Sequence, residues 1–252
     1  MKKITYYLSC LVLLLMANAC VDVDNYDAPA ETIVGRIIDK KNQKPMQTEV
    51  GDGGVRLKLL EMSWSDNPTP YYTTVKQDGT YQNTKIFKGN YIIEALGAFV
   101  PTYIVGSDGK VVKDERWKGD IKGTVNIDFE IEPFLNVEWV GEPTANADGT
   151  VSASVKITRG TDNADYQKNL ADVYLFINSS SPYVGDNNKD SRYSVRLDDS
   201  IMNDCLGQTV TLTTPKLPDN RKYYVRVGAR IDHEIDGRKR YNYNEPKGVM
   251  VN

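Results

Sequence analysis

The chain has 252 residues, of which 40% are hydrophobic and 26% are charged, which is the composition of a folded globular protein and excludes a disordered chain. A formal net charge of −3 disfavours binding to the phosphate backbone of a nucleic acid. The single histidine, His233, excludes any mechanism or metal centre that needs two histidines.

Residues 1–19 have the features of an export signal. A basic start precedes an apolar run from Leu8 to Ala17, which is too short to span a bilayer. The segment 17–20, Ala-Asn-Ala-Cys, resembles a bacterial lipobox, although the lipobox prefers leucine at the position of Ala17. We therefore predict cleavage before Cys20 and acylation of its thiol; an ordinary secretory signal followed by an incidental cysteine is the alternative.

Residues 20–31 form an acidic tether in this interpretation. Asp22, Asp24 and Asp27 follow Cys20 without apolar periodicity, which is typical of a solvated linker. The stretch resembles the acidic sequences that send Bacteroidetes lipoproteins to the outer face of the outer membrane. We expect a lipid-anchored outer-membrane protein exposed at the cell surface, whose membrane contact is its lipid; a plain flexible linker is the alternative.

From residue 32 onward the sequence predicts an all-β protein made of two consecutive β-sandwiches, at residues 32–132 and 133–252. Short strand patterns recur between Gly, Pro, Asn and Asp, and helical periodicity is nearly absent. Asp78-Gly79 predicts a tight hairpin turn, and Gly89 predicts a second turn. The strands expected in the first half are Thr32–Asp39, Val55–Met62, Tyr71–Lys76, Tyr81–Phe87, Asn90–Leu96 and Thr124–Glu132.

The first half resembles the transthyretin-like, carboxypeptidase-regulatory-type sandwich. The matching segments are Val34–Asp39, Lys44–Met46, Asp78–Tyr81 and Lys88–Ile93. Together with the tether, the chain resembles the DUF3823 family of Bacteroidetes lipoproteins, which are commonly encoded beside SusC/SusD-type glycan importers. The resemblance implies outer-membrane importer proteins and a polysaccharide or oligosaccharide as partners, and it implies no defined activity.

The second half contains a motif that resembles the tyrosine corner of fibronectin type III domains. Tyr223 follows Leu217 by six residues, and in such a corner the ring hydroxyl ties a strand to the loop before it. Asn220 and Arg221 replace the usual glycine and threonine, and Trp139 is expected in the core. The expected strands are Leu135–Val140, Val151–Thr158, Asp172–Asn178, Tyr193–Leu197, Thr209–Thr213, Lys222–Ile231 and Gly248–Val251.

No motif marks a catalytic residue or a cofactor, so we expect a protein that is not an enzyme. His233 lies between two acids at an expected hairpin tip and is interpreted as a solvated residue. Cys205 has no nucleophile signature and is interpreted as a small buried side chain. With Cys10 removed and Cys20 acylated, Cys205 has no intramolecular disulfide partner. A carboxylate pair for glycoside hydrolysis cannot be assigned among 34 acidic residues.

Two aspartate-rich turns, at residues 186–190 and 52–54, contain oxygen ligands of the kind that calcium prefers. Neither follows the spacing of an EF-hand loop, and Lys189 opposes dense anionic coordination. Because Asp and Asn are also common turn formers, we predict turns and no metal site.

Carbohydrate binding is the preferred function, because exposed aromatic rings stack on the apolar faces of sugars while amides and carboxylates bind hydroxyls. A proline-containing loop at residues 62–72 is the main candidate, since long loops often carry function. The candidate ligand-binding residues are Trp64, Tyr71, Tyr72, Trp117, Tyr241 and Tyr243. Each ring could instead pack at a loop base or between the sandwiches, and a scaffolding subunit that contacts partner proteins is the alternative function.

Overall fold

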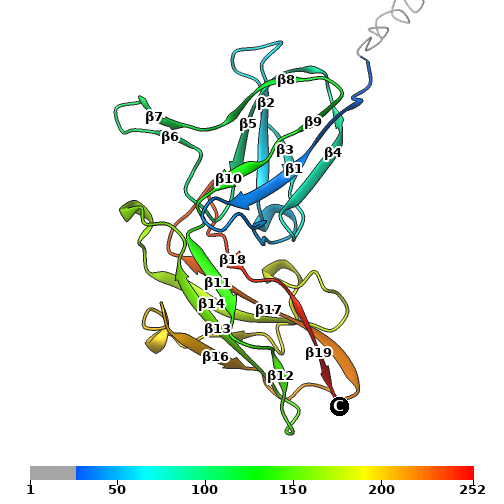
Figure 1. Cartoon of the computed structure of the whole chain (residues 1–252), viewed down its shortest axis with the longest axis vertical. Coiled ribbons are helices and arrows are strands. Elements are labelled where there is room, and N and C mark those ends of the chain that lie inside the picture. The colour runs from blue at the N-terminus through cyan, green and yellow to red at the C-terminus, as the bar shows by residue number, and fades with distance from the viewer. Residues whose placement is uncertain (1–26) are drawn as a thin grey trace, which may run out of the picture.

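The computed structural model describes residues 27–252, which form two β-sandwiches joined end to end (Figure 1). The all-β prediction is confirmed, since strands alternate with loops and four single-turn 3₁₀ helices among these residues. No helix between residues 27 and 252 is long and apolar enough to cross a membrane. The predicted signal and Cys20 lie outside the described residues.

The first sandwich contains strands β1–β10. One sheet has the order β10-β1-β4 with β9 also paired to β1, and the other has the order β3-β2-β5-β8. Alternate side chains of the central strands fill the space between the sheets, and Ile33, Leu57 and Ile93 are fully buried there. The strands are β1 (Glu31–Asp39), β2 (Arg56–Glu61), β3 (Tyr71–Thr74), β4 (Thr80–Ile86), β5 (Gly89–Leu96), β6 (Tyr103–Val105), β7 (Val111–Asp114), β8 (Trp117–Ile121), β9 (Thr124–Asn126) and β10 (Phe129–Ile131).

A two-stranded arm projects from the first sandwich (Figure 1). It consists of β6 and β7, which pair only with each other in the described sheets. At its base the Arg116 guanidinium lies 3.6 Å from the ring centroid of Tyr103 and donates two hydrogen bonds to Asp114, at 2.8 and 2.9 Å. These contacts hold the base of the arm, whose two strands pair with no other described strand.

The strand predicted at Thr124–Glu132 is divided into β9 and β10, because the backbone closes tightly on β1 between them. The Ile127 amide donates to the Val34 carbonyl at 2.9 Å, and the Asp128 carboxylate accepts from the Arg36 amide at 2.9 Å. A Cβ atom at Gly35 would lie 1.9 Å from the Ile127 carbonyl oxygen. Glycine is therefore required at this position of β1.

The Asp78-Gly79 turn is present, but the hairpin predicted around it is wrong. Gly79 has a φ of 80°, and the Lys76 amide donates to the Thr80 carbonyl at 2.8 Å. However, β3 pairs with β2 whereas β4 pairs with β1. The turn therefore carries the chain from one sheet to the other, because a local turn signal specifies a bend and not the strand partner.

The second sandwich contains strands β11–β19. In one sheet β13 pairs with β11, β12 and β16; in the other β14 and β17 are central, flanked by β15, β18 and β19. The alternation predicted for β13 is confirmed, since Val151, Ala153, Val155 and Ile157 are buried. The strands are β11 (Leu135–Trp139), β12 (Thr144–Ala145), β13 (Val151–Arg159), β14 (Leu170–Asn178), β15 (Val195–Arg196), β16 (Thr209–Thr213), β17 (Arg221–Ile231), β18 (Asn242–Tyr243) and β19 (Lys247–Val251).

The hydrogen bond predicted for the tyrosine corner is confirmed. Tyr223 is buried, and its hydroxyl donates to the carbonyl of Pro218 at 3.0 Å. Asn220, which replaces the usual glycine, has a φ of 58°, a left-handed conformation that asparagine tolerates better than most residues. The departure from the fibronectin pattern therefore leaves the backbone of the corner intact.

Candidate functional site

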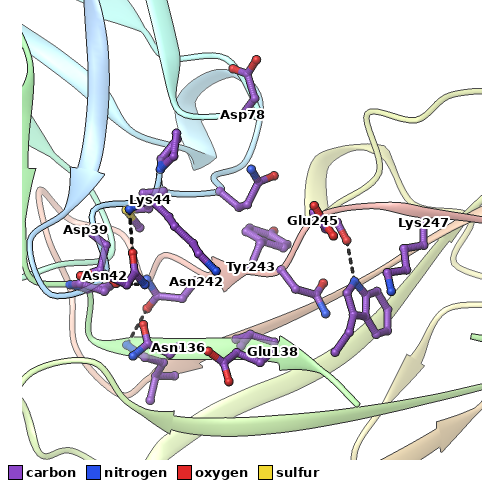
Figure 2. Close-up of a pocket in the computed structure, with 18 of the residues that line it drawn as sticks. Asp39, Asn42, Lys44, Asp78, Asn136, Glu138, Asn242, Tyr243, Glu245 and Lys247 are labelled. Atoms are coloured by element: carbon purple, nitrogen blue, oxygen red, sulfur yellow. Dashed lines mark hydrogen bonds between the residues drawn. The ribbon is translucent and has the colours of Figure 1, made fainter. Parts of the chain in front are cut away.

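The two sandwiches enclose a cleft of about 720 Å³ (Figure 2). It has two walls and a floor: the loop that follows β1, the strand β11, and the segment 242–247. The first sandwich contributes Asp39, Asn42, Lys44, Pro45, Met46, Gln47, Asp78 and Thr80. The second contributes Pro133, Leu135, Asn136, Val137, Glu138, Trp139, Asn242, Tyr243, Asn244, Glu245 and Lys247.

The loop after β1 is held in a tight turn by Asp39. Its carboxylate accepts hydrogen bonds from the Lys41 amide at 2.8 Å and from the Asn42 side chain at 2.7 Å. Its own amide donates to the Lys44 carbonyl at 2.9 Å. The turn leaves Asn42 and Lys44 exposed, and Figure 2 shows Lys44 extending from it into the cleft.

The opposite wall is β11, whose outward-facing side chains Asn136 and Glu138 alternate with buried ones. Trp139, at the end of this strand, was predicted in the core; it is half-buried and packs against the edge of the core, so one part of its ring remains exposed. Its indole N–H donates to the Glu245 carbonyl at 2.9 Å, and the Lys247 ammonium lies 5.5 Å from the ring centroid. These contacts hold the indole in a fixed position among polar groups.

The charge that the cleft offers a ligand is slightly acidic. Asp78, Glu138 and Glu245 are exposed carboxylates of the lining, whereas the Lys247 ammonium is paired with Glu142 at 2.6 Å. The Lys44 ammonium makes no ion pair with the other described residues. Because three exposed carboxylates face one free ammonium, the cleft disfavours an anionic ligand and suits one that carries neutral hydroxyl groups.

The segment Arg240–Asn244, whose last three residues belong to the floor of the cleft, joins the two sandwiches through its polar side chains. Asn242 donates to the Ala98 carbonyl of the first sandwich at 2.8 Å, and its oxygen accepts from the Leu135 amide at 3.1 Å. Arg240 donates to the carbonyls of Asp52 and Gly54, at 2.6 Å each. Burial, assisted by the neighbouring Arg56, lowers the pKa of Arg240 to about 10, so it remains cationic at neutral pH.

The structure contradicts the expectation that Tyr241 and Tyr243 present their rings to a ligand. Each side chain is only 6% exposed, and the two rings pack with Phe176 and Val184 in a cluster of their own. Aromatic residues at alternate positions therefore anchor this segment, while Arg240 and Asn242 reach the first sandwich.

A buried pair of charges crosses the junction beside this cluster. Arg226 is 0% exposed and donates to the carbonyls of Thr48 at 2.9 Å and Asn244 at 2.7 Å. Its guanidinium lies 4.2 Å from the ring centroid of Tyr243, whose hydroxyl donates to the buried Glu49 carboxylate at 2.7 Å. Burial lowers the pKa of Arg226 to about 10. Burial and Glu49 raise the pKa of Tyr243 well above its usual value, so both groups stay protonated at neutral pH and keep donating.

Trp64, Tyr71 and Tyr72 lie outside the cleft, on the loop between β2 and β3 and on β3 itself. Their side chains are 68%, 50% and 38% exposed. The Tyr71 hydroxyl accepts from the Asn83 side chain at 2.9 Å, and the Arg56 guanidinium lies 4.5 Å from the Tyr72 ring centroid. A ligand-binding role for these three residues stays a prediction.

Trp117 belongs to β8 and packs against the core of the first sandwich, so it does not present an open ring. Its charged neighbours do not prevent this packing, because Asp114 pairs with both Arg116 and Lys118, at 2.8 and 2.7 Å. The segment around Trp117 is highly charged, which by itself suggests an exposed ring, and these ion pairs account for the charges.

His233 and Cys205 are both packed against protein. The His233 ring makes edge contacts with Phe134 and Tyr166 at centroid distances of 5.8 and 5.2 Å and is partly exposed, so it is less solvated than expected. Burial lowers the pKa of His233. Cys205 is buried as predicted, and its thiol donates to the Met202 carbonyl at 3.0 Å.

Residues 27–252 contain no group of three or more His, Cys, Asp or Glu side chains arranged to hold a metal ion. In the turn at residues 186–190, Asp186 is paired with Lys189 at 2.5 Å. In the turn at residues 52–54, the Asp52 carboxylate lies 3.9 Å from Arg56. Both aspartates thus face cations.

Two family models match the chain: a protein of unknown function (DUF3823) N-terminal domain at residues 31–132, and a domain of unknown function (DUF3823_C) at residues 140–246. A DUF3823 family protein from Bacteroides uniformis ATCC 8492 is 35% identical, with a TM-score of 0.81 over 89% of this chain and 100% of its own. A DUF3823 family protein from Parabacteroides merdae ATCC 43184 is 20% identical, with a TM-score of 0.63 over 88% and 100%.

A third solved structure, named a "putative carbohydrate binding protein" from Bacteroides uniformis ATCC 8492, has the same fold. It is 22% identical, with a TM-score of 0.68 over 88% of this chain and 100% of its own. No curated protein matches the chain. The two family models together cover both sandwiches, and the chain therefore belongs to the DUF3823 family.

Proposed function

We propose that the protein binds a glycan without catalysing its cleavage, and that the binding site is the cleft between the two sandwiches. The observation that carries the proposal is the set of groups that line this cleft. The Trp139 indole, held by its hydrogen bond to the Glu245 carbonyl, lies there beside amides and exposed carboxylates. An indole contributes apolar contact area to a sugar ring, while Asn42, Asn136 and Glu138 are suited to bind its hydroxyls.

The junction supports binding because it holds the walls of the cleft in place before a ligand arrives. Asn242 and Arg226 connect the sandwiches through buried hydrogen bonds, and Tyr243 connects them through Glu49. A site that is already ordered loses less conformational entropy on binding. The solved structure named for carbohydrate binding, which shares the fold, is in keeping with this function.

In the cell, we place this activity in an accessory subunit of a polysaccharide-uptake system of the SusC/SusD type. The subunit is anchored to the outer membrane by acylated Cys20, is exposed at the cell surface and works beside importer proteins. This placement is supported by the lipobox-like segment, the acidic tether and the family to which the chain belongs.

Affinity electrophoresis against a panel of neutral and acidic polysaccharides tests the function. Oligosaccharides prepared from the polysaccharide that slows the protein in the gel are then used in calorimetry to test the site. We expect Trp139→Ala and Glu138→Ala each to weaken binding by about tenfold or more, the effect of losing roughly 1–3 kcal/mol of contacts. Glu138 is exposed, so Glu138→Ala should leave the thermal midpoint unchanged and report on binding alone.

Trp64→Ala is the matched control, because Trp64 is a loop tryptophan outside the cleft. If Trp64→Ala weakens binding while Trp139→Ala and Glu138→Ala leave it unchanged, the ligand binds at the exposed loop and the cleft assignment is wrong. If no polysaccharide of the panel retards the wild-type protein, the proposed glycan binding fails.

A scaffolding role is the second candidate function, and the arm formed by β6 and β7 favours it. Val105, Val111 and Val112 are 46%, 55% and 71% exposed on this arm. Clustered exposed valines are typical of surfaces that contact other proteins. Replacing Val111 and Val112 by serine should reduce co-purification of importer proteins from membranes and leave polysaccharide binding unchanged; unchanged co-purification would reject the arm as their contact site.

A further inference from the structure

We infer that the end of the first sandwich where the chain enters β1 rests against the membrane, and that Trp64 and Phe87 contact its lipid there. The inference rests on the lipid anchor of the proposed function, and it concerns a different surface from the glycan cleft. The inference assigns Trp64, the most exposed tryptophan, to lipid contact and not to the sugar binding predicted from the sequence.

Segments distant in the sequence meet at this end of the molecule. Glu31, the first residue of β1, pairs with Ile86 at the end of β4, next to Phe87. The loop between β2 and β3 joins them, because the Ser63 hydroxyl accepts from the Asn90 amide at 2.8 Å. Figure 1 shows the start of β1, the β2–β3 loop and the connection from β8 to β9 at the end of the first sandwich remote from the second.

The length of the tether brings this end close to the bilayer. Seven residue steps separate Cys20 from Asp27, the first described residue, and a fully extended chain covers about 25 Å in that length. The acyl chains of Cys20 must lie in the membrane, so Asp27, four residues before β1, is restricted to a shell of that thickness above it. The cleft lies at the other end of β1, beyond nine residues of strand, or roughly 30 Å.

The side chains exposed at this end are those found at membrane–water interfaces. Trp64 is 68% exposed and Phe87 is 47% exposed, and aromatic rings of this kind are favoured at the level of lipid head groups. Lys88 and Lys122 are exposed beside them, as are the acids Asp27, Asp66 and Asp120, so the charge of this end is mixed and the inference rests on the aromatic rings. The lysines complement the phosphates of anionic lipid.

The orientation that follows places the cleft outward. β1 runs from the membrane end to Asp39, whose carboxylate shapes the cleft loop. When the start of β1 faces the membrane, the cleft therefore faces the medium. The second sandwich lies still farther from the membrane (Figure 1).

Fluorescence quenching in vesicles tests the contact. The full-length acylated protein is reconstituted into vesicles of phosphatidylethanolamine and phosphatidylglycerol, with or without bromine on the acyl chains. In a variant that keeps only Trp64, through Trp117→Phe and Trp139→Phe, we expect a blue-shifted emission and a marked loss of intensity in brominated vesicles. The matched variant that keeps only Trp139, through Trp64→Phe and Trp117→Phe, should show neither change.

Quenching of neither tryptophan, in protein whose acylation is verified by mass spectrometry, overturns the inference. Equal quenching of both also overturns it, because the molecule would then lie on its side. A mass without acyl chains on Cys20 rejects the anchor and the inference together. Glycan binding by the Cys20→Ser chain in solution is measured separately, so a failure of the cleft proposal is distinguishable from a failure of the membrane contact.

Discussion

Removing one hydroxyl group from the junction, through Tyr243→Phe, should lower the free energy of unfolding by about 2 kcal/mol. The hydroxyl donates to the Glu49 carboxylate at 2.7 Å, and a buried hydrogen bond to a charged group contributes roughly 1.5–3 kcal/mol. The phenyl ring keeps its packing against Phe176 and its position beside Arg226. The hydroxyl also accepts from the Asp186 amide at 3.3 Å, so the loss reports on the hydrogen bonds of this hydroxyl, of which the one to Glu49 is the stronger, and not on a cavity.

Urea unfolding followed by tryptophan fluorescence and by circular dichroism measures this loss. With a denaturant slope of about 2–3 kcal/mol/M, the midpoint should fall by roughly 0.7–1 M. Because the lost bond crosses between the sandwiches, we expect Tyr243→Phe to weaken the coupling of their unfolding, so that the two probes separate where they coincide in the wild type.

A double-mutant cycle with Glu49→Gln isolates the pair. In the Tyr243→Phe protein, Glu49 keeps the amides of Val50 at 2.9 Å and Asn187 at 3.4 Å, so its charge is only partly satisfied. Adding Glu49→Gln should therefore cost much less than it does in the wild type, with a coupling energy of about 1 kcal/mol or more. Strictly additive losses, or an unchanged midpoint in Tyr243→Phe, would refute the assignment of this bond to the junction.

Three further outcomes are expected. Tyr223→Phe should lower the free energy of unfolding by about 1 kcal/mol through loss of its bond to Pro218; an unchanged denaturation midpoint would show that the corner carries no stability. Burial alone would raise the pKa of Asp172, but its hydrogen bonds from Arg196 and Arg230 hold that pKa below its usual value. The Asp172 carboxylate therefore stabilises the folded state above the ordinary aspartate pKa of about 3.9, and this stabilisation is lost as the pH falls through the lower pKa of the folded protein. The difference in unfolding free energy between wild type and Asp172→Asn should narrow below about pH 4. A difference that does not change with pH would contradict the ion pairs. Cys20→Ser should abolish lipid labelling and release the protein from the membrane, and retained detergent partitioning would reject the anchor.

Strand positions followed from the sequence where a buried face alternates with a polar one. The strand expected at Thr209–Thr213 matches β16 at both ends, and those expected for β1, β13 and β17 are correct within one residue. Alternation of this kind reflects a local rule, since successive side chains of a strand point to opposite faces. The partners of β3 and β4 do not follow from such a rule, which is why the turn at Asp78-Gly79 was mistaken for a hairpin.

Charged residues hide the pattern of β7 and β8, and β6 has only three residues, too few to show an alternation. In β8 the inward positions are Trp117, Gly119 and Ile121, separated by Lys118 and Asp120, and a glycine in the middle weakens the apolar signal. The absence of a side chain at Gly119 leaves room for the Trp117 ring, because a Cβ at this position would lie 3.0 Å from it. The ion pairs that make the charges tolerable become visible only once the strands are in position.

The candidate cleft could not be predicted because its walls are far apart in the sequence. Lys44 was named only in a segment that resembles the transthyretin-like sandwich, and Trp139 only as an expected core residue. Their convergence depends on Asn242, which binds the Ala98 carbonyl of one sandwich and the Leu135 amide of the other. Alternation of aromatic and polar residues in this segment is equally typical of a binding ridge and of a junction, and only the packing of Tyr241 and Tyr243 distinguishes the two.

The position of β1 has a mechanical consequence. Its neighbours are β4 on one side and β9 and β10 on the other, so a force applied to the chain before Glu31 acts along a strand that is bonded on both edges. Such a force loads the hydrogen bonds in shear, and many of them must break together before β1 can slide. A force on the chain before Glu31 is therefore resisted by the hydrogen bonds on both edges of β1 together.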